Sequence, residues 1–190
     1  KTLFIHADRA KEISEAINFV KNYKINKVAI VGGSESYLVT ELLKQNNISV
    51  VVERIHTLPD HPESDIDQAY KLPYQLQKAG VLFCLNNEGD QEAAGVRNLP
   101  FMAGTAAAYG LTKEQALQSI TLNAAKILGI DKTTGSIEVG KDANLFISAG
   151  DALDMRTNKV EYELIKGVGI NLYNDQQALY DTYKKKYGLK

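Results

Sequence analysis

The sequence predicts an α/β fold of parallel strand–helix units, followed by a small β-rich part and a last helix. Short apolar segments alternate with amphipathic segments of helical period over residues 1–130, a pattern typical of parallel strands joined by right-handed crossovers. Glycines bound several short apolar runs in residues 131–174, which favours short strands joined by turns. Residues 175–190 have the period of a helix. We therefore divide the chain into these three parts.

The first part contains four predicted strands, at residues 2–5, 27–31, 49–52 and 81–85. Helices are predicted between them at residues 10–23, 35–45 and 66–79. In the second helix, the spacing of Leu38, Leu42 and Leu43 predicts that all three side chains face the core. In the third, Pro73 has no backbone N–H, so we expect it to kink or interrupt the helix.

Residues 111–129 give the clearest helix signal in the chain. Thr112 is a good N-cap and Gln115 follows three residues later, so the pair can form a capping box. Apolar residues at helical spacing predict one helix that continues to Gly129: Ala116, Ile120, Ala124 and Ile127.

The C-terminal parts are predicted to hold short strands and one helix. The strands are expected at residues 136–139, 144–147, 160–165 and 168–172. The helix is expected over residues 175–187, with Leu179, Tyr180 and Tyr183 as its packing face. The lysines at residues 184–186 complement the negative end of that helix.

Composition excludes some classes of function. The 190 residues are 44% hydrophobic, enough to bury a core of one domain or of a domain with a small appendage. A net charge of -1 gives no electrostatic case for nucleic acid or for an anionic membrane surface as a partner. No apolar run approaches the roughly 20 residues that span a bilayer, so we expect a soluble protein, cytoplasmic or periplasmic. The chain starts at Lys1 inside a strand signal, which suggests an upstream part.

Polar residues cluster after the predicted strands. Chemistry in parallel α/β folds gathers at the carboxyl ends of the strands, so we expect a candidate site there. The residues at these ends are His6 and Asp8, Gly32 to Glu35, Glu53 to His56, and Asn86, Asn87, Glu88 and Asp90.

Three ordered motifs carry a resemblance to a known family. They are GL-x4-AL from Gly110, T-x-N-A-A-x-x-LG from Thr121, and GSIE-x-GKDA from Gly135, followed by an apolar run. This order resembles the end of proteins of the amidohydrolase superfamily, near imidazolonepropionase. The resemblance implies a metal-dependent (β/α)8 barrel of the TIM type with a small β-sandwich domain. The four units here then resemble barrel strands five to eight, and residues 131–174 resemble the end of the sandwich.

Half a closed barrel would expose two strand edges and an apolar interior. We therefore expect one of three arrangements. The chain pairs with a missing N-terminal half, pairs with a second copy, or folds as an open sheet covered by its own helices.

The resemblance also assigns roles to strand-end residues. It implies that His6 is a metal ligand, while the family's paired histidines of strand one are not present in this chain. The histidine that many family members have on barrel strand six corresponds to a position near Gly32, and glycine offers no ligand. The family's aspartate on barrel strand eight corresponds most nearly to Asn87 or Glu88 in this chain. Because an amide cannot take a proton from water, general-base chemistry would depend on Glu88.

Two further residues are candidates for substrate contact. His56 follows the third strand and either contacts substrate or bonds to the backbone of its loop. Arg97 follows the fourth strand and either binds a carboxylate or fixes the loop. His61, between two loop residues, is expected to be an exposed loop residue.

The implied function is hydrolysis of non-peptide C–N bonds, of the cyclic amide type, in a small-molecule substrate with zinc or iron as cofactor. A catalytic zinc needs about three protein ligands. The sequence offers His6 with His56 and Glu88 as uncertain additions, so we expect the chain alone to bind metal weakly and to be inactive. Two alternatives stay open. The chain is a non-catalytic, degenerate barrel scaffold, or the glycine turn at residues 32–34 with Glu53 forms a nucleotide site.

Overall fold

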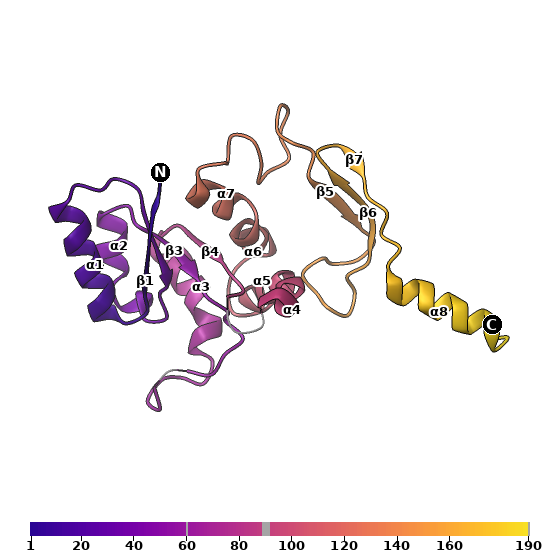
Figure 1. Cartoon of the computed structure of the whole chain (residues 1–190). Coiled ribbons are helices and arrows are strands. Elements are labelled where there is room, and N and C mark those ends of the chain that lie inside the picture. The colour runs from indigo at the N-terminus through magenta and orange to yellow at the C-terminus, as the bar shows by residue number, and fades with distance from the viewer. Residues whose placement is uncertain (60, 89–91, 190) are drawn as a thin grey trace.

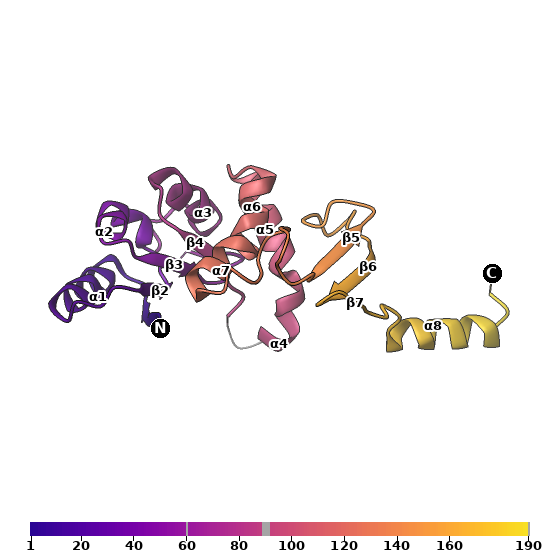
Figure 2. The same ribbon diagram turned by 90° about the horizontal axis from the view of Figure 1, so that it is seen from above.

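A computed structural model of the chain describes residues 1–59, 61–88 and 92–189 (Figure 1). It contains a four-stranded parallel sheet and a three-stranded antiparallel sheet. The last helix extends away from the second sheet in both views (Figures 1 and 2). The mixed α/β class predicted from the sequence is confirmed.

The parallel sheet has its strands in chain order: β1 (Leu3–Ala7), β2 (Val28–Gly32), β3 (Ser49–Val52) and β4 (Phe83–Leu85). Two rows of side chains cross it in register. One row is Ile5, Ile30, Val50 and Phe83, and the other is His6, Val31, Val51 and Cys84. Since strand residues alternate between faces, the two rows lie on opposite faces of the sheet.

Helices cover the face that carries Ile30 and Phe83. They are α1 (Ala10–Asn22), α2 (Thr40–Gln45) and α3 (Gln68–Ala79), with a 3₁₀ turn, η1 (Ser36–Leu38), before α2. Their buried side chains form the main core with the sheet: Ile13, Ile17 and Val20 from α1, Leu43 from α2, and Leu72 and Leu76 from α3. The predicted alternation of strands and helices therefore forms a layer of helices on one face of the parallel sheet.

Two details of these helices differ from the prediction. Leu38 and Leu42 are 59% and 38% exposed, because the 3₁₀ turn has three residues per turn and rotates the apolar stripe, so only Leu43 is buried. Pro73 does not interrupt α3, which is continuous. It is the sixth residue of the helix, so its missing N–H leaves only the carbonyl of Ala69 without a helical donor.

The segment after β4 is helical. It comprises α4 (Glu92–Gly95), a 3₁₀ turn η2 (Val96–Asn98), α5 (Leu99–Ala108), α6 (Lys113–Ile120) and α7 (Leu122–Leu128). Helix α5 was not predicted, because its sequence, LPFMAGTAAA, is apolar or small almost throughout and has little amphipathic period.

The single helix predicted from Thr112 to Gly129 is two helices. The capping box is present, with Thr112 Oγ1 accepting from Gln115 N at 3.1 Å and Thr112 N donating to Gln115 Oε1 at 2.9 Å. Thr121 breaks the helix at φ −129° and ψ −91°. Its hydroxyl donates to the carbonyl of Leu117 at 2.7 Å, which competes with the backbone ladder.

The opposite face of the parallel sheet is only partly covered. Ala124 and Ile127 of α7 pack against Ala29 and Cys84 there. Phe4 and Leu82 remain 40% and 38% exposed. Among the described residues the chain thus forms an open sheet that its own helices cover on one face and in part on the other.

The antiparallel sheet contains β5 (Leu145–Ser148), β6 (Val160–Ile165) and β7 (Val168–Gly169) in that order. The strand predicted at residues 136–139 is absent, and Ile137 is 86% exposed. A strand needs a partner ladder, and no described segment lies beside this one to supply it. The strand predicted at 168–172 is shortened to two residues.

The last helix, α8 (Asp175–Lys186), forms where it was predicted and is capped by Asn174. Its predicted packing face does not pack: Leu179, Tyr180 and Tyr183 are 57%, 62% and 51% exposed. Because α8 points away from the sheets, no described element lies against that face (Figure 2). No helix in the described part of the chain is both long enough and apolar enough to cross a membrane.

Candidate metal centre

Three side chains meet at the carboxyl ends of the parallel strands. His6 lies near the end of β1, Glu53 directly follows β3, and Glu88 lies three residues after the end of β4. In β1 and β3 the alternation of side chains places His6 and Glu53 on the same face, the one that carries Val51. Parallel strands end at one edge of a sheet, so residues far apart in the sequence converge here.

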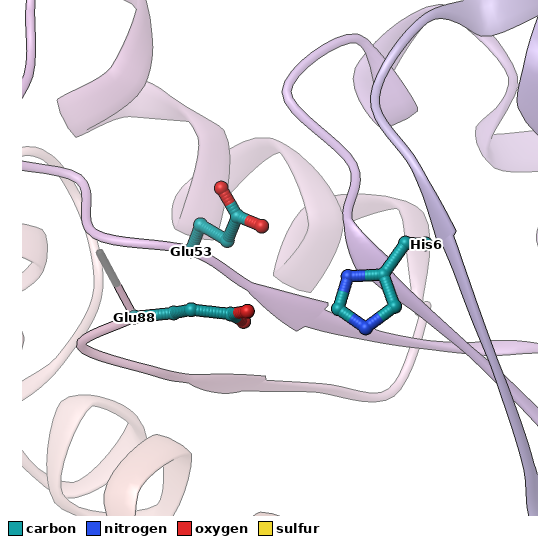
Figure 3. A group of neighbouring side chains, drawn as sticks. All are labelled: His6, Glu53 and Glu88. Atoms are coloured by element: carbon teal, nitrogen blue, oxygen red, sulfur yellow. The ribbon is translucent and has the colours of Figure 1, made fainter. Parts of the chain in front are cut away.

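The ligand atoms of His6, Glu53 and Glu88 all lie within 4.8 Å of one another. Figure 3 shows the Glu88 carboxylate extending toward the imidazole ring of His6, with the Glu53 carboxylate above it in the view. His6 and Glu88 are exposed and Glu53 is half-buried. Asn86 Nδ2 donates to Glu88 Oε2 at 3.1 Å and so orients that carboxylate. The group joins one neutral nitrogen donor to two anionic oxygen donors.

This donor set is of the kind that binds a divalent metal. Zinc binds histidine nitrogen and carboxylate oxygen at about 2.0–2.2 Å, so two ligands of one ion lie no more than about 4.4 Å apart. The ligand atoms of the group, all within 4.8 Å of one another, lie near this range. Mixed imidazole and carboxylate donors suit zinc or non-haem iron.

Two positions that the family resemblance pointed to do not join this group. Asn87 is buried, and its amide lies against Gly95 of α4. At Gly32, φ is +101° and the carboxylate of Asp8 occupies the space that a side chain would take. Asp90, which the sequence also placed at this edge, lies outside the described residues.

A pocket of about 540 Å³ opens beside the group. Glu53 and Glu88 line it, together with Arg9, Arg54 and His61. His61 is exposed as expected, but its Nε2 lies 2.9 Å from Glu35 Oε1. The other oxygen of Glu35 accepts from the backbone N–H of Ala10 at 2.7 Å. The loop after β3 is thereby tied across the pocket to the start of α1.

The two predicted substrate contacts lie elsewhere. His56 Nε2 is 2.8 Å from Thr105 Oγ1 of α5, and the ring meets Tyr70 edge-on at 6.0 Å between centroids. Burial, reinforced by the positive charge of Arg54, lowers the pKa of His56 below 6.5. Arg97 is exposed on η2. Neither His56 nor Arg97 is among the described residues that line the pocket.

The glycine turn after β2 does not have the geometry of a phosphate cradle. Gly33 N donates to the carbonyl of Ala7 at 3.0 Å, and Glu35 N donates to that of Asp8 at 2.9 Å. The Asp8 carboxylate covers Gly32. The backbone N–H groups of Gly33 and Glu35 are thus already bonded, and the Asp8 carboxylate lies where a phosphate would approach the turn.

Glu53 was predicted only as a strand-end residue and as part of the nucleotide alternative. The period of two places Glu53 on the same face as Val51, but only the sheet register shows that this face also carries His6. Asn86 carried no such signal, because its role is set by the loop conformation after β4.

A family model, curated proteins and a solved structure that are similar to this chain point to the same family. The model of the Amidohydrolase family matches residues 19–170. The imidazolonepropionase of Shewanella frigidimarina is 40% identical over 83 residues, 44% of this chain and 18% of its own length. That of Flavobacterium psychrophilum is 25% identical over 148 residues, 72% of this chain and 36% of its own length.

Among solved structures, an amidohydrolase from Thermotoga maritima is similar with a TM-score of 0.79 and 34% identity, over 90% of this chain and 43% of that one. The chain therefore spans less than half the length of these relatives. A family match over most of its residues nevertheless shows that this chain belongs to the amidohydrolase family.

Proposed function

We propose that this chain forms the metal-binding part of a hydrolase that cleaves non-peptide C–N bonds in a small molecule. The convergence of His6, Glu53 and Glu88 at one edge of a parallel sheet is the observation that supports it most directly. In this proposal β1 to β4 correspond to barrel strands five to eight, and β5 to β7 belong to the small sandwich domain. A cyclic amide is the substrate class, because the curated relatives are named for an imidazolone.

In the proposed site, His6 and Glu53 hold the metal, and Glu88 adds one carboxylate oxygen as a third ligand. A divalent metal bound there would supply an activated water and polarise the substrate carbonyl. Glu88, oriented by Asn86, accepts the proton of the attacking water. Buried Asn87 fixes the loop that carries Glu88, so its amide is not required to act as a base.

We assign substrate contact to Arg9 and Arg54 ahead of His56 and Arg97. Both arginines line the pocket beside Glu53 and Glu88. Their guanidinium groups can bind a carbonyl or carboxylate of the substrate with paired hydrogen bonds. His56, hydrogen-bonded to Thr105, would instead support the loop after β3.

Three ligands, two of them on exposed side chains, bind a metal weakly. In this proposal an N-terminal barrel half or a second copy completes the barrel. We therefore expect the isolated chain to bind zinc reversibly and to be inactive. Calorimetric titration of the metal-free chain with zinc measures the first point. His6→Ala, Glu53→Gln and Glu88→Gln should each weaken zinc binding about tenfold or more, because each removes a ligand.

A matched control is Glu15→Gln, which removes an exposed carboxylate of α1 that pairs only loosely with Lys11, at 4.0 Å. It should leave zinc affinity unchanged. Equal affinity in all variants would contradict the proposed centre. Hydrolysis of cyclic amides and N-acyl compounds by the isolated chain, lost in Glu88→Gln, would support the reaction but contradict the expected inactivity.

One alternative is a scaffold without catalysis. The absence of a ligand at Gly32 and the burial of Asn87 favour it, since both positions would carry catalytic groups in an active relative. Failure to bind zinc, together with no turnover when the chain is joined to its barrel partner, would support this alternative.

A further inference from the structure

A second pocket lies at the opposite end of the parallel sheet from the candidate metal centre. It has a volume of about 290 Å³ and is formed where the strands begin. Its lining includes Thr2 before β1, Ser49 at the start of β3, Leu82 before β4 and the last turn of α7. Figure 1 shows the N-terminus and α7 at this same end, and Thr2 Oγ1 donates to the carbonyl of Ile127 at 3.3 Å.

Every charged side chain that lines this pocket, among the described residues, is a lysine: Lys27, Lys44 and Lys126. They come from three separate elements, the residue before β2, the last turn of α2 and the last turn of α7. The Lys44 side chain lies across Gly80, with Nζ 3.5 Å from where a Cβ of Gly80 would stand. The elements therefore bring three positive charges to one cavity.

These lysines have no carboxylate partner within ion-pair distance among the described residues, whereas other lysines of the chain do. Lys71 contacts Asp67 at 2.6 Å, and Lys141 contacts Glu138 at 3.0 Å. The three lysines form a local positive charge, although the net charge of the chain is -1. Uncompensated like charges repel one another, so a bound anion would stabilise the arrangement.

Helix ends explain only part of this pattern. Lysines complement the negative carboxyl end of a helix, and Lys44 and Lys126 occupy such positions, as do Lys21 in α1 and Lys78 in α3. Lys27 belongs to no helix, and Lys21 and Lys78 do not line the pocket. The helix dipole thus accounts for two of the lysines and leaves their convergence with the third unexplained.

We propose that this pocket binds a small phosphate compound, with a diphosphate group as the best fit. Ammonium groups bind phosphate oxygens as point charges and donors. Asn26 and Asn47, which also line the pocket, offer amide N–H donors. The volume is at the small end of ligand sites, which matches one or two phosphate groups and excludes a large cofactor. This site is independent of the metal centre.

Calorimetry with pyrophosphate and with inorganic phosphate, at constant ionic strength and without metal, tests the proposal. We expect saturable binding with pyrophosphate tighter than phosphate, because its higher charge meets all three lysines. Lys27→Gln, Lys44→Gln and Lys126→Gln should each weaken pyrophosphate binding about tenfold or more. Raising the salt concentration should weaken it as well.

The matched controls are Lys21→Gln and Lys78→Gln, which remove lysines from the same position at helix ends outside the pocket. They should leave pyrophosphate affinity unchanged, as should Glu88→Gln at the metal centre. Circular dichroism checks that each variant is folded. No saturable binding, or an equal loss in the pocket and control variants, would overturn the proposal.

Discussion

At the scale of single residues, Gly104 shows how closely the first part of the chain approaches the loop after β5. Gly104 lies inside α5, where alanine would normally favour the helix by about 1 kcal/mol. A Cβ at this position would meet the backbone carbonyl of Leu153 well inside van der Waals contact. Leu153 is itself part of the main core.

Gly104→Ala should therefore destabilise the protein by about 1–3 kcal/mol, because backbone cannot move aside as a flexible side chain does. Urea unfolding followed by circular dichroism measures the change. The control is Gly169→Ala in β7, where no atom lies within 4 Å of the added Cβ. It should be close to neutral. A stabilised Gly104→Ala would show that helix propensity outweighs the contact.

In the candidate metal centre, the direction of single side chains decides which residues meet. His6 was predicted as a ligand and Glu88 as the base, and the structure brings both into one group with Glu53. Local patterns identify which residues end a strand and what chemistry they carry. Whether loop side chains point inward depends on the loop backbone, as the opposite placements of the neighbours Asn87 and Glu88 show. Their roles as catalytic and ligand residues stay proposals.

At the scale of elements, two helices have the same capping box but different surroundings. Thr112 caps α6, whose Ala116 lies in the main core, while Asn174 caps α8, which has no buried residue. A cap contributes similar local free energy in both helices, about 1 kcal/mol. Because only α6 packs into the core, only its cap contributes to the free energy of unfolding of the whole molecule.

Thr112→Ala should lower the free energy of unfolding by about 1 kcal/mol, as measured by urea denaturation. Asn174→Ala should leave this global value unchanged and instead increase amide hydrogen exchange within α8, because α8 can unfold locally. Equal global effects of the two substitutions would mean that α8 is coupled to the core.

At the scale of the whole molecule, the partly open face of the parallel sheet is the main unsatisfied feature. Phe4 and Leu82 are exposed on it, and among the described strands β1 and β4 each pair with one neighbour only. Unpaired edges and exposed apolar side chains favour association. The complementary barrel half of the proposed function, or a second copy, would cover both.

We expect the isolated chain to self-associate at micromolar concentration, as measured by sedimentation velocity. Phe4→Glu should reduce association because it places a charge on the open face. Phe19→Glu, on the exposed side of α1 and 48% exposed, is the control and should not. If the unchanged chain is a monomer, or if both substitutions have equal effects, the open face of the sheet does not drive association.

Local patterns of 5 to 20 residues were enough to predict the layer of parallel strands, the helices with a clear apolar stripe and caps, and the family. The boundaries at residues 130 and 174 stay predictions. Only the tertiary structure decided that Thr121 divides a helix, that residues 136–139 lack a strand partner, and that α8 stands free. It also decided which strand-end side chains meet, since convergence of His6, Glu53 and Glu88 depends on sheet register and loop backbone across more than 80 residues.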